Sequence, residues 1–176
     1  MEFELSFKPI HHPEDAYSAN QLGGFVSVYT EGRFPDLTEA EVVLVGLPEY
    51  RGSSTTGDVD SLQLLRKEFY QLYQGKERLR IADLGDLLQG EQLSDTYQLL
   101  ADVLAECERR GLFALIIGGG QAATFGQYKA CVQSGRMVNL VTIDARFDLG
   151  LSTDLLDSQS YLSPHVLPCA VHKSSL

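Results

Sequence analysis

Uninterrupted apolar runs recur along the chain and predict strands. Residues 41–47 and 112–117 are almost entirely aliphatic and short, as is typical of strands buried on both faces. Two further strands are predicted over residues 78–84 and 137–143. Near the start of the chain, apolar and polar side chains alternate over residues 2–9, which predicts a half-buried strand or an extended arm.

The segments between these strands have helical spacing. Apolar positions recur every three or four residues in two segments. One segment precedes the strand that is predicted to end at Gly85 and Asp86, and the other follows it. The later helix begins at Ser94, and Gly111 is placed to end it. The predicted buried stripes are Leu62, Leu65, Phe69 and Leu72 in one helix and Leu93, Tyr97, Leu100, Leu104 and Cys107 in the other.

This alternation of strands and helices predicts the α/β class, in which helices cover both faces of a mostly parallel sheet. We therefore expect a three-layer αβα arrangement. At 176 residues, the chain has the length of a single domain over residues 1–176. Residues 1–40 lack helical spacing, and we expect them to form an extended arm or hairpin at its edge.

Three consecutive glycines, Gly118, Gly119 and Gly120, follow the strand at 112–117. With the helical segment after them and the strand at 137–143, they predict a βαβ unit. Glycines at a strand end allow close backbone approach, but they could also cradle a phosphate. The spacing does not match Gly-x-Gly-x-x-Gly, and the lysine of a P-loop is missing, so a nucleotide-binding module is the weaker interpretation.

Charged side chains gather at the end of the second strand of this unit. Asp144, Arg146 and Asp148 follow one another at intervals of two residues. If the strand continues through them, all three side chains point to one face. That face lies at the carboxyl end of the strand, where open parallel sheets bind their ligands.

Strand, Gly-Gly-Gly, polar residue, helix, strand and Asp-Ala-x-Phe-Asp together resemble the ureohydrolase family of arginases, agmatinases and formimidoylglutamases. In that family a histidine follows the glycines and the second motif reads Asp-Ala-His-x-Asp, and these residues bind two manganese ions. The resemblance implies an arginase-like fold and places Asp144 and Asp148 at metal-ligand positions. Gln121 and Arg146 stand at the two histidine positions.

The two replacements differ in their chemistry. Gln121 offers a neutral carbonyl oxygen, which is a poor but feasible manganese ligand. Arg146 has no lone pair to donate and stays protonated. At about 4 Å and an effective dielectric of about 20, it would repel a divalent ion by about 8 kcal/mol. We therefore expect Arg146 to neutralise Asp144 and Asp148 in place of metal, with no cofactor bound.

Three interpretations of function follow. The first is a ureohydrolase-like protein with a degraded dimanganese site that is not catalytically active in this form. The second is a hydrolase of linear amidines or guanidines that holds manganese in an altered site, with Arg146 turned away; a small guanidino or amidine ligand fits both. The third is the nucleotide-binding module.

Composition narrows the partners and the compartment. A net charge of −10 argues against nucleic acid and anionic membranes, and no apolar run approaches a membrane span. The acidic start of the chain and three widely spaced cysteines favour a cytoplasmic protein with reduced thiols. Folds of this kind usually form symmetric homo-oligomers. Because ureohydrolases are longer and carry a third metal motif, we expect the fold to be incomplete at the C-terminus.

Overall fold

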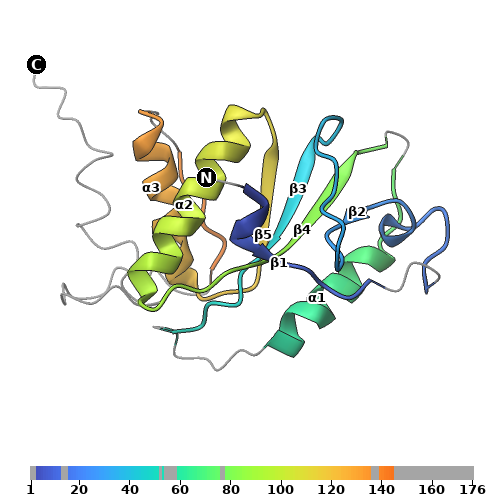
Figure 1. Ribbon diagram of the computed structural model, residues 1–176, viewed down its shortest axis with the longest axis horizontal. Coiled ribbons are helices and arrows are strands. Elements are labelled where there is room, and N and C mark those ends of the chain that lie inside the picture. The colour runs from blue at the N-terminus through green and yellow to red at the C-terminus, as the bar shows by residue number, and fades with distance from the viewer. Residues whose placement is uncertain are drawn as a thin grey trace, which may run out of the picture.

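The computed structural model of the chain has one mixed sheet with helices packed on both of its faces (Figure 1). Each helix and strand of this arrangement lies in the first 133 residues. The structure describes residues 3–12, 16–51, 53, 59–75, 78–135 and 139–144.

The centre of the sheet is parallel. β3 (Val42–Gly46) lies between β4 (Ile81–Leu87) and β5 (Phe113–Ile117) and runs parallel to both. On its other edge β4 pairs with two short strands, β1 (Phe7–Lys8), which is antiparallel, and β2 (Ser27–Val28), which is parallel. The predicted strands around residues 41–47, 78–84 and 112–117 and the mostly parallel sheet are confirmed.

Helices cover the two faces of the sheet. α1 (Val59–Gln71) packs on one face with Leu44, whereas α2 (Leu93–Arg109) and α3 (Thr124–Gln133) lie against the other with Val45. Neighbouring residues of β3 face opposite ways because side chains alternate along a strand. The predicted three-layer αβα class is confirmed. No helix of the described residues combines the length and the hydropathy that a membrane crossing needs.

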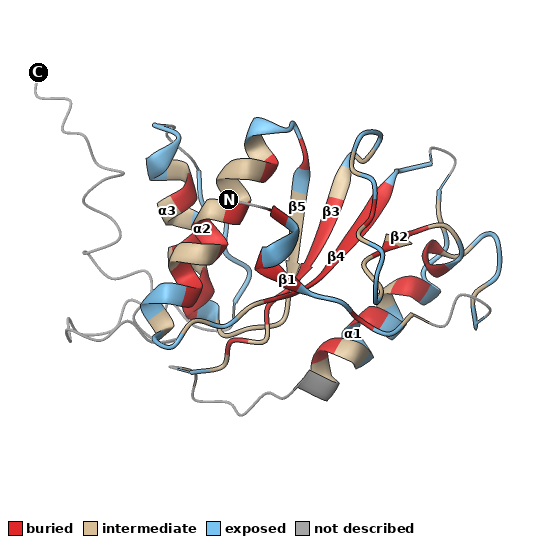
Figure 2. Cartoon of the chain, viewed as in Figure 1, coloured by how far each residue is buried: buried red, intermediate tan, exposed pale blue. Residues whose placement is uncertain are grey.

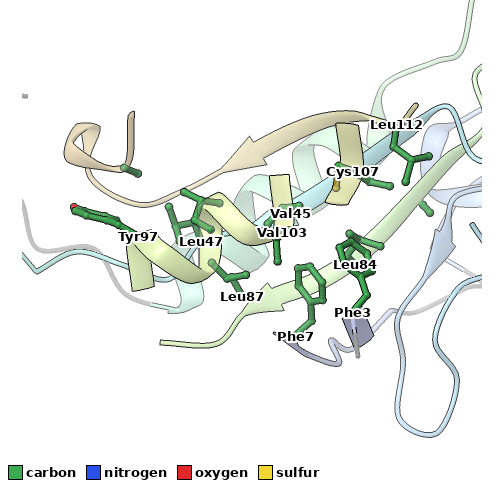
Figure 3. Close-up of a cluster of buried hydrophobic side chains, with 14 of the residues drawn as sticks. Phe3, Phe7, Val45, Leu47, Leu84, Leu87, Tyr97, Val103, Cys107 and Leu112 are labelled. Carbon is green, nitrogen blue, oxygen red and sulfur yellow. The ribbon is translucent and has the colours of Figure 1, made fainter. Parts of the chain in front are cut away.

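The main core lies between α2 and the sheet (Figure 3). Three positions of the stripe predicted on α2, Tyr97, Leu100 and Cys107, are buried, and the other two, Leu93 and Leu104, are partly buried against the same core. Gly111 ends the helix in a left-handed conformation with φ +73°. Burial is greatest in β3 and β4 and least in β5 (Figure 2). The core side chains of α2 are Tyr97, Leu100, Val103 and Cys107.

The ends of some elements differ from the predicted ones. β4 runs through Gly85 to Leu87, because Gly85 takes φ +81° and the pairing with β3 shifts register nearby, so this glycine bends the strand without ending it. Within residues 2–9, where a half-buried strand or extended arm was predicted, only Phe7–Lys8 of the described residues forms a strand, and Phe3–Ser6 forms a 3-10 helix. That turn buries Phe3 and leaves Leu5 67% exposed.

The strand predicted over residues 137–143 is not formed by its described part. Residues 139–144 pair with no described strand, and Ile143 is 99% exposed. β5, which would be its nearest neighbour in a βαβ unit, has β3 as its one partner in the described sheet, and Phe113 is 68% exposed. A strand exists through its hydrogen-bonded neighbour, so an apolar run without one stays irregular.

Candidate functional site

Loops at the carboxyl ends of β3 and β5 are tied together by backbone hydrogen bonds. The amide of Leu47 donates to the carbonyl of Ile117 at 2.9 Å, and the amide of Gly120 donates to the carbonyl of Glu49 at 2.9 Å. The first bond joins the ends of the two strands, and the second joins the β3 loop to the glycine turn that follows β5. The position of that turn therefore depends on the β3 loop.

The glycine turn needs glycine at two of its positions. Gly118 and Gly119 have φ values of +79° and +72°, which side chains disfavour. A Cβ atom at Gly118 would also collide with the side chain of Leu62, and one at Gly119 would press on Leu47. The turn thus lies close against α1 and the end of β3, as the close-approach interpretation predicts.

The turn delivers Gln121 to the residue that the family resemblance pairs with it. Gln121 opens a short 3-10 helix before α3, and its Nε2 donates a hydrogen bond to a carboxylate oxygen of Asp144, 23 residues away. Both residues are exposed at this edge of the molecule. Arg146 and Asp148, the other two predicted site residues, lie outside the described residues.

Two of the four residues predicted at the metal site, Gln121 and Asp144, belong to the described part of the chain. In the part of the chain that the structure describes, no three His, Cys, Asp or Glu side chains lie together as metal ligands would. The Gln121 amide presents an N–H to Asp144, and an N–H cannot bind a cation. The side-chain carbonyl oxygen of Gln121 would face the Asp144 carboxylate only if a cation lay between the two groups, because both are acceptors and repel each other.

A buried carboxylate anchors the β3 loop beside this turn. Glu49 is 1% exposed, and both of its carboxylate oxygens accept hydrogen bonds from Arg51. Nε donates to Oε1 at 2.9 Å and Nη2 donates to Oε2 at 2.6 Å. Burial opposes the charge of Glu49, but the hydrogen bonds from Arg51 outweigh it and lower the pKa of Glu49. The pair is therefore an ionised one.

A second ionic cluster lies under α1. Arg66 is 2% exposed and donates from Nε to Asp83 Oδ2 at 2.9 Å and from Nη1 to Asp86 Oδ1 at 2.6 Å. Tyr70 donates its hydroxyl to Asp83 at 2.6 Å. Although burial disfavours the cation, the two carboxylates raise the pKa of Arg66. Gly46 faces this cluster, where any Cβ would meet Asp86 and Arg66.

The stripe predicted to be buried on α1 is only half right, because Leu62 is buried and Phe69 packs against the core, whereas the other two positions are exposed. Leu65 and Leu72 are 48% and 54% exposed, whereas Arg66 and Tyr70 are buried four and eight residues after Leu62. The same helical spacing runs through these three positions, but apolar content alone favoured the other stripe. Asp83 and Asp86, on either side of the bend at residue 85, were the available signal for a buried cation.

Comparison with known proteins identifies the family of this chain. The family model described as "Arginase family" matches residues 40–165. Among curated proteins, a formimidoylglutamase of Klebsiella pneumoniae is 28% identical over 144 residues, which are 77% of this chain and 45% of that protein. A formimidoylglutamase of Salmonella paratyphi C is 29% identical over 129 residues, 68% of this chain and 41% of that protein.

Solved structures agree on the fold. Trypanosoma cruzi formiminoglutamase, determined with Mn²⁺, matches with a TM-score of 0.67 at 19% identity, over 89% of this chain and 54% of that one. The agmatine ureohydrolase of Thermoplasma volcanium matches with a TM-score of 0.65 at 20% identity, over 92% of this chain and 54% of that one. The chain thus spans about half the length of the proteins that it matches.

Proposed function

This chain belongs to the arginase family, and on that premise we propose that it is a formimidoylglutamase-like member whose dimanganese site is degraded and which is not a hydrolase in this form. The Gln121–Asp144 hydrogen bond carries this proposal. It satisfies Asp144 through an amide N–H at the position where the family resemblance expects metal and histidine. This donor is neutral, so it hydrogen-bonds Asp144 without compensating the negative charge of the carboxylate.

The charge of Arg146 adds to the same argument. In the sequence it lies between Asp144 and Asp148, so a guanidinium close to both carboxylates would form charge-assisted hydrogen bonds with them. We propose that Arg146 supplies the positive charge that manganese supplies in the metal-bound relatives. Asp148 would then be an acceptor for Arg146.

The second candidate is a metal-dependent hydrolase of linear guanidines or amidines that works with an altered site. Retention of Asp144 and Asp148 in the sequence favours it. It requires the Gln121 amide to turn its oxygen toward a metal and Arg146 to point away. The family match favours both of these interpretations over a nucleotide-binding module. A homo-oligomer is proposed in either case by analogy with such folds.

Elemental analysis tests the proposal. The complete natural protein is purified in excess manganese and dialysed against metal-free buffer, with Trypanosoma cruzi formiminoglutamase carried through the same steps as the positive control. We expect far less than stoichiometric manganese in this protein and retained manganese in the control. Manganese retained near stoichiometric amounts by this protein would support the hydrolase instead.

A further inference from the structure

Arg51 joins the loops that follow β3 and β4 and contacts the start of α2. It belongs to the loop after β3 and holds Glu49 of the same loop through two hydrogen bonds. Its Nη1 donates to the carbonyl of Glu91 at 2.8 Å, and its Nη2 donates to the carbonyl of Gly90 at 3.0 Å. Both carbonyls lie in the loop between β4 and α2. Nη2 also donates to Thr96 Oγ1, in the first turns of α2, at 3.1 Å.

Glu49 carries this connection on to the glycine turn. While its carboxylate binds Arg51, its carbonyl accepts the amide of Gly120 at 2.9 Å, and Gln121 is the next residue. The side chain of Ser53 also lies against the α-carbon of Gly120, where a Cβ would be 3.2 Å away. The carboxylate and the backbone carbonyl of Glu49 thus connect Arg51 to the glycine turn that positions Gln121.

We infer that Arg51 is a positioning residue, which acts through Glu49 to hold the glycine turn where Gln121 meets Asp144. The inference rests on the proposed function only in taking that hydrogen bond as the site. Its physical basis is geometric, because a planar guanidinium can bind one carboxylate at two points and two carbonyls at the same time. A shorter or neutral side chain cannot bind the Glu49 carboxylate at two points and also reach the two carbonyls after β4.

A positioning role predicts effects that differ from those of lost stability alone. Arg51→Gln leaves the buried carboxylate of Glu49 without its cation, so this variant is expected to be less stable. The double variant Glu49→Gln with Arg51→Gln removes the stranded charge, and its melting temperature should recover toward that of the natural protein. The bonds to Gly90 and Glu91 are lost in both variants, so we expect the glycine turn to be displaced in both.

The readout is hydrogen exchange of the Gly120 amide together with the side-chain amide resonances of Gln121, in metal-free protein. In the double variant we expect Gly120 to exchange about tenfold faster, the change for one lost hydrogen bond of about 1.4 kcal/mol. The Gln121 resonances should move toward those of a solvated amide. The amide of Gln98, which donates to Asp102 at 2.8 Å within α2, serves as the unaffected reference.

Arg109→Gln is the matched control, because Arg109 pairs with Glu106 on the exposed surface of α2 and should leave both signals unchanged. The inference is overturned if the stable double variant shows natural Gly120 exchange and Gln121 resonances. It is also overturned if that variant does not fold, because the pair would then be a requirement of the whole fold. Manganese binding bears on the proposed function alone, so the two can fail separately.

Discussion

Histidine at both replaced positions, Gln121→His with Arg146→His, is expected to give the complete natural protein manganese binding that it otherwise lacks. The change removes a fixed positive charge and adds two imidazole ligands. Even one third of the estimated repulsion of about 8 kcal/mol corresponds to an increase in affinity of about a hundredfold. Isothermal titration with manganese measures the gain.

The single variants separate the two effects. Arg146→His alone should give most of the increase, because it removes the repulsion, whereas Gln121→His alone should give little. Adding Asp144→Asn to the restored variant should abolish the gain, since it removes a carboxylate ligand. If the natural protein binds manganese as tightly as the restored variant, the electrostatic argument is wrong.

Replacement of Arg66 by methionine is expected to lower the free energy of unfolding by about 3–5 kcal/mol. Asp83 is fully buried, and without Arg66 its carboxylate keeps only the Tyr70 hydroxyl and the amide of Gly85 as partners. The destabilisation by an uncompensated buried charge is larger than the stabilisation that the packed methionine side chain contributes. Equilibrium urea unfolding measures the loss.

Arg109→Met is the surface control for this prediction. Arg109 makes the same kind of charged pair, with Glu106 at 2.6 Å, but its side chain is 69% exposed, so the expected loss is about 0–1 kcal/mol. Adding Asp83→Asn to Arg66→Met should recover part of the stability, because it neutralises the stranded carboxylate. A loss no larger than that of the control would show that Arg66 does not compensate Asp83.

The regular part of the fold could be predicted because it depends on local pattern. The strand around 41–47, the helix from Ser94 to its stop at Gly111 and the turn at Gly118 each follow from apolar runs, helical spacing or glycine chemistry. The residues that these elements contact are either close in sequence or could be exchanged for other apolar residues. Such elements keep their pattern whatever else packs against them.

The ionic clusters could not be predicted in the same way, because each joins residues from different elements. In the sequence, Arg66 resembles a solvent-exposed arginine on the surface of a helix. In the fold, β4 places Asp83 next to it. Glu49 and Arg51 look like part of a polar loop, although α2 closes over them. The family resemblance placed Gln121 and Asp144 at the same site, but the hydrogen bond between them was not predicted, since no local rule relates the two positions.

The strand expected over 137–143 shows the remaining limit. An apolar run predicts that a segment will be buried, but it does not say which segment buries it. In the described residues 139–144 no neighbouring strand pairs with this run, and its side chains stay exposed. Local pattern therefore identified the segment correctly as apolar and wrongly as a formed strand.

Paramagnetic broadening by manganese is the most direct test of the claim that an amide and not a metal satisfies Asp144. The side-chain amide signals of Gln121 are followed while manganese is added to the natural protein, with Gln98, which also donates to an aspartate, as the reference. We predict that both amides lose intensity equally and only through non-specific contact. Selective loss of the Gln121 signals at stoichiometric manganese would contradict the account.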